Sequence, residues 1–141
     1  MTRSVATFSI VGYDPITGDL GVAVQSKFLA VGAVVPWARA GVGAVATQAF
    51  ANTEYGPRGL ELLAAGLTAA EAVERLVQAD PGADVRQVGI VDAQGRAAAH
   101  TGEHCLPWAG DVQGQYCTAQ GNILVSAATV NRMVEVFTAT T

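Results

Sequence analysis

The fold of this chain is most clearly set by residues 41–59, which read GVGAVATQAFANTEYGPRG. The first part alternates small and branched apolar residues with a period of two, which is typical of a strand packed on both faces. Polar residues follow at Thr47, Gln48 and Asn52, and Tyr55-Gly56-Pro57 then interrupts the chain before a helical pattern. Because a rigid strand can hold exposed groups in place, we predict a functional site just beyond this strand. The alternative is that these polar side chains only cap backbone groups.

The composition indicates one domain with few surface charges. The chain has 141 residues, of which half are hydrophobic and only 14% are charged, against about a quarter in ordinary soluble domains. We therefore expect another subunit to cover part of the surface, as in a homo-oligomer. The net charge of −4 argues against a nucleic-acid partner.

The sequence also predicts where the protein works. Its uncharged segments are too short to cross a bilayer, and its first residues do not resemble a signal peptide. We therefore expect a cytoplasmic protein that does not bind membranes. In that compartment Cys105 and Cys117 would stay reduced, and two cysteines are too few for a disulfide scaffold.

Sequence periodicity divides the chain into strands, two helices, further strands and a last helix. The first third is predicted to be a β-meander, made of a hairpin at residues 5–13 and 20–28, a strand or bulged edge at 32–36 and a strand at 37–47. There follow helices at 57–66 and 68–80, a hairpin at 85–91 and 96–101, a loop at 103–114 and a strand at 116–124. Hairpin connections predict an α+β fold with mainly antiparallel sheets.

The last predicted helix has one apolar face, formed at positions i, i+3, i+4 and i+7 by Val130, Met133, Val134 and Phe137. No predicted element follows to cover this face. We therefore expect it to contribute to self-association.

A series of motifs resembles an uncharacterised bacterial family with an N-terminal-nucleophile (Ntn) hydrolase-like fold. The similarity covers about residues 6–138 and includes the segment 7–52 followed in order by YGPRGL, RQVGIVDAQGR, TGEHCLPWAG and AQGN. It implies a four-layer αββα sandwich, in which two stacked antiparallel sheets lie between helix layers. Members of that family are longer, which implies that the second sheet here is incomplete or is completed by another chain. The family has no established activity.

The Ntn resemblance implies a role for Thr7. Ntn hydrolases cleave amides with a Thr, Ser or Cys that begins the first strand, and its free α-amine is the general base. Thr7 is the matching position, but six residues precede it, so its nitrogen is an amide. Either the chain is cut between Ala6 and Thr7, or Thr2 becomes terminal after removal of Met1, or this chemistry is absent. In the last case Thr7 is an ordinary strand threonine.

Further candidates are polar residues at predicted strand ends. Lys27, the only lysine, would lower the pKa of a nucleophile or hold an oxyanion, or it is a solubilising charge. The other candidate substrate contacts or oxyanion donors are Ser26, Thr47, Gln48, Asn52, Gln120 and Asn122. Gln120 and Asn122 alternatively shape a turn.

Two motifs are set aside. His100, His104 and Cys105 lie close in sequence, but Gly102 argues against a helix that would place both histidines on one face, so we predict no metal and no cofactor. Residues 41–46 match G-x-G-x-x-A, yet they lie inside an alternating strand pattern rather than opening a helix. Two functions remain: an Ntn-type amidohydrolase acting on a small or peptide-like molecule, and a non-catalytic binding or assembly module with the same fold.

Overall fold

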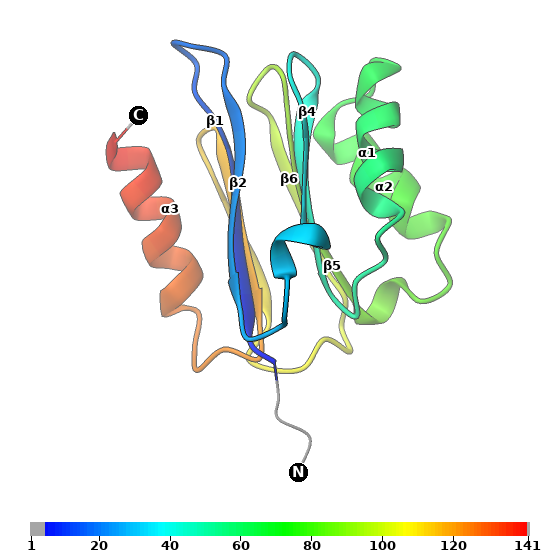
Figure 1. The fold of residues 1–141 in the computed structure, drawn as a ribbon, viewed down its shortest axis with the longest axis vertical. Helices are drawn as coiled ribbons and strands as arrows, with labels where there is room; N and C mark the ends of the chain where they lie inside the picture. Colours follow the sequence, from blue (N-terminus) through cyan, green and yellow to red (C-terminus); the bar gives the residue numbers. More distant parts are fainter. Residues whose placement is uncertain (1–4, 141) are drawn as a thin grey trace.

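The structure is a computed structural model, and it describes residues 5–140. This part of the chain forms two antiparallel four-stranded sheets and three α-helices, which confirms the predicted α+β class (Figure 1). The strands are β1 (Thr7–Tyr13), β2 (Leu20–Ser26), β3 (Pro36–Arg39), β4 (Gly43–Ala49), β5 (Arg86–Asp92), β6 (Ala97–Thr101), β7 (Gly110–Gly114) and β8 (Cys117–Asn122). The helices are α1 (Tyr55–Ala64), α2 (Ala69–Gln78) and α3 (Ala128–Thr140). Thr2, the alternative nucleophile, lies outside the described residues.

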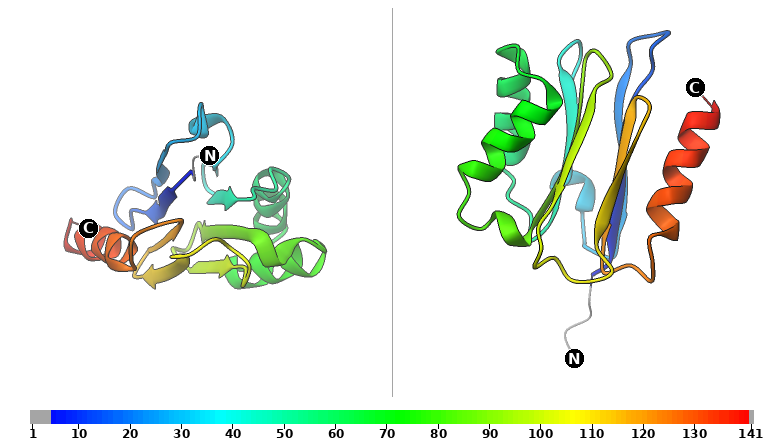
Figure 2. Two further views of the ribbon diagram at one scale, coloured as in Figure 1. Left: turned by 90° about the horizontal axis from the view of Figure 1, so that it is seen from below. Right: turned by 180° about the vertical axis from the view of Figure 1, so that it is seen from behind.

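The sheets face each other, with helices on their outer sides (Figures 1 and 2). The first sheet has the order β2-β1-β8-β7 and is covered by α3, whereas the second has the order β3-β4-β5-β6 and is covered by α1 and α2. Neighbouring strands are antiparallel, so the start of β1 lies at the same end as the ends of β2, β4 and β8. We call this end the Thr7 end.

Strand alternation fills the space between the sheets. Thr7, Ser9 and Val11 of β1 are buried and face the second sheet, as their spacing predicts. Away from the Thr7 end this space is apolar, with a core of Val11, Val35, Ala44, Ala46 and Val91. A second core, which includes Val45, Leu60, Leu76 and Ile90, lies between the second sheet and its helices.

The helix pair follows local sequence signals. Thr68 forms the predicted capping box at the start of α2: its hydroxyl accepts from the Glu71 N–H at 3.2 Å, and a Glu71 carboxylate oxygen accepts from the Thr68 N–H at 2.7 Å. The α1–α2 pair packs on β4, β5 and β6 of the second sheet.

Three predictions about the strands were wrong. Residues 31–33 form a short 3₁₀ helix rather than a strand, after Ala30 adopts a left-handed conformation with φ of 57°. The first third is not one meander, because β1 and β2 pair in the first sheet while β3 and β4 pair in the second. Strand β7 lies within the segment predicted to be a loop, since its sequence GDVQG has little strand propensity and is stabilised by pairing with β8.

The apolar face of α3 packs in part on the first sheet, contrary to the sequence-based prediction that nothing covers it: Met133, Val134 and Phe137 are half-buried. Val130 is completely buried, and the helix packs on β7, β8 and β1. The Phe137 ring lies so close to Gly12 that a Cβ atom there would approach one ring carbon to 2.5 Å. Sequence periodicity could not predict that α3 packs on the outer face of the first sheet. Because this packing uses the apolar face of the helix, that face no longer supports self-association.

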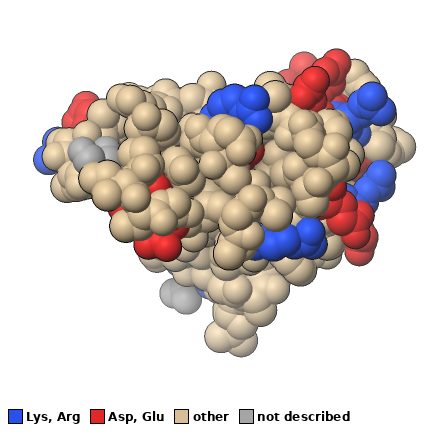
Figure 3. All heavy atoms as spheres, turned by 90° about the horizontal axis from the view of Figure 1, so that it is seen from above, with Lys and Arg blue, Asp and Glu red and all other residues tan. Residues whose placement is uncertain are grey.

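Charge is sparse and mixed on the outside. Viewed from the end opposite the Thr7 end, acidic and basic side chains are scattered over a mostly uncharged surface (Figure 3). None of the helices within residues 5–140 is long and apolar enough to span a membrane.

Candidate functional site

The space between the sheets becomes polar toward the Thr7 end. Strand register aligns Ser26, Thr7 and Asn122 across β2, β1 and β8. The next inward-facing row carries Ser9 and Gln120. All of these side chains except Ser26, which is half-buried, are buried, so their polar atoms depend on hydrogen bonds within the protein.

Gln48 of β4 connects this polar layer to the second sheet. Its Oε1 accepts from Ser9 Oγ at 2.7 Å, and Gln120 Nε2 donates to the same hydroxyl at 2.7 Å. Gln48 Nε2 donates to Gln87 Oε1 at 2.8 Å and to the Gln120 carbonyl at 3.2 Å. Because both amide hydrogens of Gln48 are used, it can accept a further hydrogen bond but has no donor left for an oxyanion.

Gln87 of β5 is the centre of the network. Besides Gln48, Asn122 Nδ2 donates to its Oε1 at 3.1 Å. Its own Nε2 lies within hydrogen-bonding distance of Thr101 Oγ1 at 2.9 Å and of the Gly121 carbonyl at 2.9 Å. Neither Gln87 nor Ser9 was among the residues predicted from the sequence. Each is a polar residue at an inward-facing position of a mostly apolar strand, and this pattern could have identified both as site residues.

A glycine leaves room for the buried amides. Gly89 lies two residues after Gln87 in β5. A Cβ atom on Gly89 would lie 2.1 Å from Gln120 Oε1 and 2.9 Å from Thr118 Cγ2. Glycine is therefore needed where the two sheets approach each other around these side chains.

Thr7 lies at the outer edge of the polar layer. Its Oγ1 is 2.8 Å from Ser26 Oγ, which also donates to the Ala6 carbonyl at 3.2 Å and accepts from the Phe28 N–H at 3.0 Å. Since Ser26 uses its one proton on the carbonyl, the Thr7 hydroxyl donates to Ser26. One serine hydroxyl thus contacts both the Thr7 side chain and the peptide bond that precedes Thr7.

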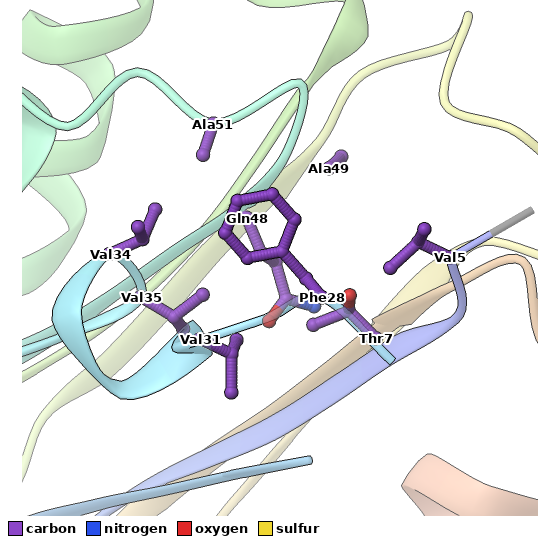
Figure 4. A pocket seen from close by; sticks show the side chains of 9 residues that line it. All are labelled: Val5, Thr7, Phe28, Val31, Val34, Val35, Gln48, Ala49 and Ala51. Carbon is purple, nitrogen blue, oxygen red and sulfur yellow. The ribbon is translucent and has the colours of Figure 1, made fainter. Parts of the chain in front are cut away.

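A pocket of about 280 Å³ opens beside Thr7 and Gln48 (Figure 4). In this view the valines of segment 31–35 lie on one side of the pocket and Val5 on the other. Among the described residues the lining consists of Val5, Thr7, Phe28, Val31, Val34, Val35, Gln48, Ala49 and Ala51. This is a mainly apolar pocket with two polar side chains at its inner end, as is common for sites that bind small molecules.

The backbone is strained where two strands leave this site. Ala49 follows Gln48 with φ of 67°, and Ile123 follows Asn122 with φ of 56°. Left-handed conformations of non-glycine residues cost about 1–3 kcal/mol, and they occur preferentially at functional sites. A β-branched residue such as Ile123 is especially unusual in this region.

The structure separates three candidate residues from Thr7. Lys27 is exposed and does not line the pocket. Thr47 and Gln48 lie inside β4, so the interpretation that they follow the strand was wrong. Alternation then turns Thr47 toward the helix layer, where its hydroxyl donates to the Asn52 carbonyl at 3.0 Å. Asn52 donates through Nδ2 to Asp80 Oδ2 at 3.1 Å.

Asp80 joins the loops behind the pocket. It accepts hydrogen bonds from Asn52, from the Gly82 N–H at 2.8 Å and from Arg86 Nε at 3.1 Å. Burial would raise the pKa of Asp80, but these hydrogen bonds outweigh that effect and lower the pKa to about 2. Nearby, burial and the Asp80 carboxylate raise the pKa of the Tyr55 hydroxyl. Asn52 and Asp80 therefore hold the loops in place rather than contact the pocket.

The histidine and cysteine cluster makes internal contacts. His104 Nδ1 lies 2.7 Å from Asp84 Oδ2, and His100 Nε2 lies 2.9 Å from the Ala83 carbonyl. Cys105 is buried and donates to the Arg86 carbonyl, and burial raises the pKa of its thiol. Within residues 5–140 there is no group of three or more His, Cys, Asp or Glu side chains that could hold a metal.

The chain is an α+β domain, in which two antiparallel sheets face each other and helices cover their outer sides. Its candidate site is the buried polar layer at the Thr7 end. The sequence model of a family of unknown function, DUF1028, matches residues 7–141, and the chain therefore belongs to the DUF1028 family. The crystal structure of protein SPO2555 from Silicibacter pomeroyi, which is described by the same family model, superposes with a TM-score of 0.92 at 34% sequence identity. The alignment covers 95% of this chain, which spans 62% of that protein. No curated protein matches the sequence.

Proposed function

We propose that this protein is an amide-bond hydrolase of the Ntn kind, in which Thr7 becomes the nucleophile once the Ala6–Thr7 bond is cut. The observation that carries the proposal is the position of Ser26, whose hydroxyl contacts both Thr7 Oγ1 and the Ala6 carbonyl oxygen. The order of layers and the position of Thr7 at the start of an interior strand support an Ntn-like sandwich. The family match also begins at Thr7.

The cleavage step uses groups already in contact. The Thr7 hydroxyl oxygen attacks the Ala6 carbonyl carbon and forms an ester, while the carbon–nitrogen bond breaks and the hydroxyl proton moves to the Thr7 nitrogen. Ser26 stabilises the negative charge that develops on the carbonyl oxygen. Water then hydrolyses the ester, which leaves a carboxylate on Ala6 and a free amine on Thr7.

The free amine would then act as general base for the Thr7 hydroxyl. An α-amine has a pKa of about 7.7–8.0, which suits proton transfer near neutral pH. Asn122, the register partner of Thr7, is the best placed oxyanion donor. Its amide nitrogen makes one hydrogen bond among the described residues, to Gln87, so a second N–H remains available.

Intact mass measurement tests this proposal. We expect the purified chain to lose its first six residues and the new terminus to react with an amide-directed electrophile. Thr7→Ala should abolish both the cleavage and the labelling, and Ser26→Ala should slow the cleavage by about 10²-fold or more, as loss of an oxyanion donor does. Thr47→Val is the matched control, because this strand threonine faces the helix layer. An intact, unlabelled chain that starts at residue 1 or 2 would contradict the proposal.

A second function is a binding or assembly module that keeps the fold without catalysis. It is supported by the acylated nitrogen of Thr7, by the exposed position of Lys27 and by the lack of a free donor on Gln48. An intact chain that binds amides without turnover is the expected result for this function.

We also propose that the protein is cytoplasmic and self-associates, and the low share of charged residues, 14%, supports self-association. Sedimentation velocity at high micromolar concentration tests association, and a single monomeric species would argue against it.

A further inference from the structure

The Thr7 end carries a group of exposed apolar side chains, which we call the apolar rim. Among residues 5–140, seven large hydrophobic side chains are strongly exposed, and five of them lie on loops at the Thr7 end. These five are Phe28, Leu29, Phe50, Leu106 and Val125. Exposed apolar groups gathered around a pocket are typical of a surface that binds an apolar ligand.

Phe28 connects this rim to the pocket. Its side chain is 51% exposed, and it also lines the pocket with Thr7 and Gln48 (Figure 4). Among residues 5–140 no charged side chain lines the pocket, and Gln48 has only acceptor capacity left. A ligand carboxylate or ammonium group would therefore lose its hydration without gaining a charged partner.

The protein's own chain already places apolar residues at this site. Val5 lines the pocket, and Ser26 binds the carbonyl of Ala6, the residue that would acylate Thr7 during cleavage. In the proposed reaction a substrate's acyl group would be joined to the same Thr7 oxygen. The chemistry of residues 5 and 6 therefore indicates which acyl groups this position accepts.

We infer that the pocket binds the acyl side of amide substrates and selects small, uncharged, apolar acyl groups. Turnover of such amides depends on the proposed function, whereas their binding does not. The volume of about 280 Å³ lies at the lower limit of small-molecule sites, which are typically about 300–1,000 Å³, so it suits a branched aliphatic or single aromatic group.

Binding is tested on the full chain carrying Thr7→Ala, which can neither cut itself nor turn over a ligand. The probes are 4-methylpentanamide and succinamate, which have similar shapes but end in an isopropyl group and a carboxylate. NMR titration should show saturable binding of 4-methylpentanamide, with shifts of the Gln48 side-chain amide, and binding of succinamate at least about tenfold weaker.

Substitution of Phe28 separates specificity from folding. Phe28→Ala should weaken binding of 4-methylpentanamide, whereas Ile16→Ala should not, because Ile16 is 88% exposed on the turn at the opposite end. Phe28→Arg should reverse the preference in favour of succinamate, a result that misfolding cannot produce. Equal binding of the two probes, or binding of neither, would overturn the inference.

Turnover by the unsubstituted chain distinguishes this inference from the proposed function. The substrates are the 4-methylpentanoyl and succinyl amides of 7-amino-4-methylcoumarin, and we expect kcat/KM to favour the first by at least about tenfold. Selective binding without turnover supports the pocket and contradicts the proposed hydrolase. Turnover without selectivity supports the hydrolase and overturns the inference about the pocket.

Discussion

The two ends of the space between the sheets are built from the same strands but with different chemistry. One end holds Val11, Ala44 and Val91, which pack together in an apolar core. The Thr7 end holds Gln48 and Gln87 of the second sheet, whose amides bond to Ser9, Gln120, Gly121 and Asn122 of the first sheet. The apolar end needs only matching volumes, whereas the Thr7 end needs each buried polar atom to find a partner at a fixed distance.

This difference shows how one strand can serve stability and function. In β1, Val11 contributes to the apolar core, while Ser9 and Thr7, two and four residues earlier, belong to the polar layer. A buried hydrogen-bonded layer fixes side-chain positions more strictly than apolar packing does, which is what a site near Thr7 requires.

The largest expected effect is on the polar layer. Gln87→Leu keeps a similar volume but leaves several buried partners without hydrogen bonds, so we expect the free energy of unfolding to fall by about 3–5 kcal/mol. Urea denaturation measures this loss. A loss below about 1 kcal/mol would mean that water replaces the amide and that the two ends are less different than we infer.

At the apolar end we expect a smaller loss. Val91→Ala removes two methyl groups from the core, which should lower the free energy of unfolding by about 2 kcal/mol in the same assay. The cleavage at Thr7 and the binding of amides should stay as in the unsubstituted protein. Loss of either property in a folded Val91→Ala protein would contradict the assignment of function to the Thr7 end alone.

The loops at the Thr7 end should also give it a dependence on acidic pH. The pKa of Asp80 is lowered to about 2 in the folded protein, below the value of about 3.9 of a free Asp, so its contribution is complete above pH ~4. It is lost as the pH falls toward 2. Asp80→Asn should therefore cost about 1 kcal/mol near pH 6, after allowance for solvent screening, and almost nothing near pH 2. A cost that does not change with pH would argue against this ion pair.

The smallest expected effect concerns the exposed pair of His104 and Asp84. The hydrogen bond that His104 donates to the Asp84 carboxylate raises the pKa of His104, and the Glu103 charge adds to this effect. Any stabilisation is present below the pKa of a free histidine, about 6.5, and is lost as the pH rises through the raised value. NMR titration should show that Asp84→Asn lowers the pKa of His104. An unchanged pKa would show that the pair is not formed in solution.

Local sequence patterns were enough to identify most elements of the fold. The period of two places Thr7 and Ser9 on the same face of β1, and the capping box locates the start of α2. Strand β7 was missed because its pairing with β8, rather than its own residues, stabilises it. The candidate site was predicted in part: Thr7, Ser26, Gln48, Gln120 and Asn122 do lie together, whereas Gln87 was not recognised.

The sequence by itself determined most of the strands and the cap of α2, since these depend on neighbours within a few residues. The short hairpin of β1 and β2 then brings Ser26 to Thr7. Only the tertiary structure decided that Gln120 bonds to Ser9, 111 positions away, and that α3 covers the first sheet rather than remaining exposed. Such contacts arise when whole faces become buried together, and no local period specifies which faces will meet.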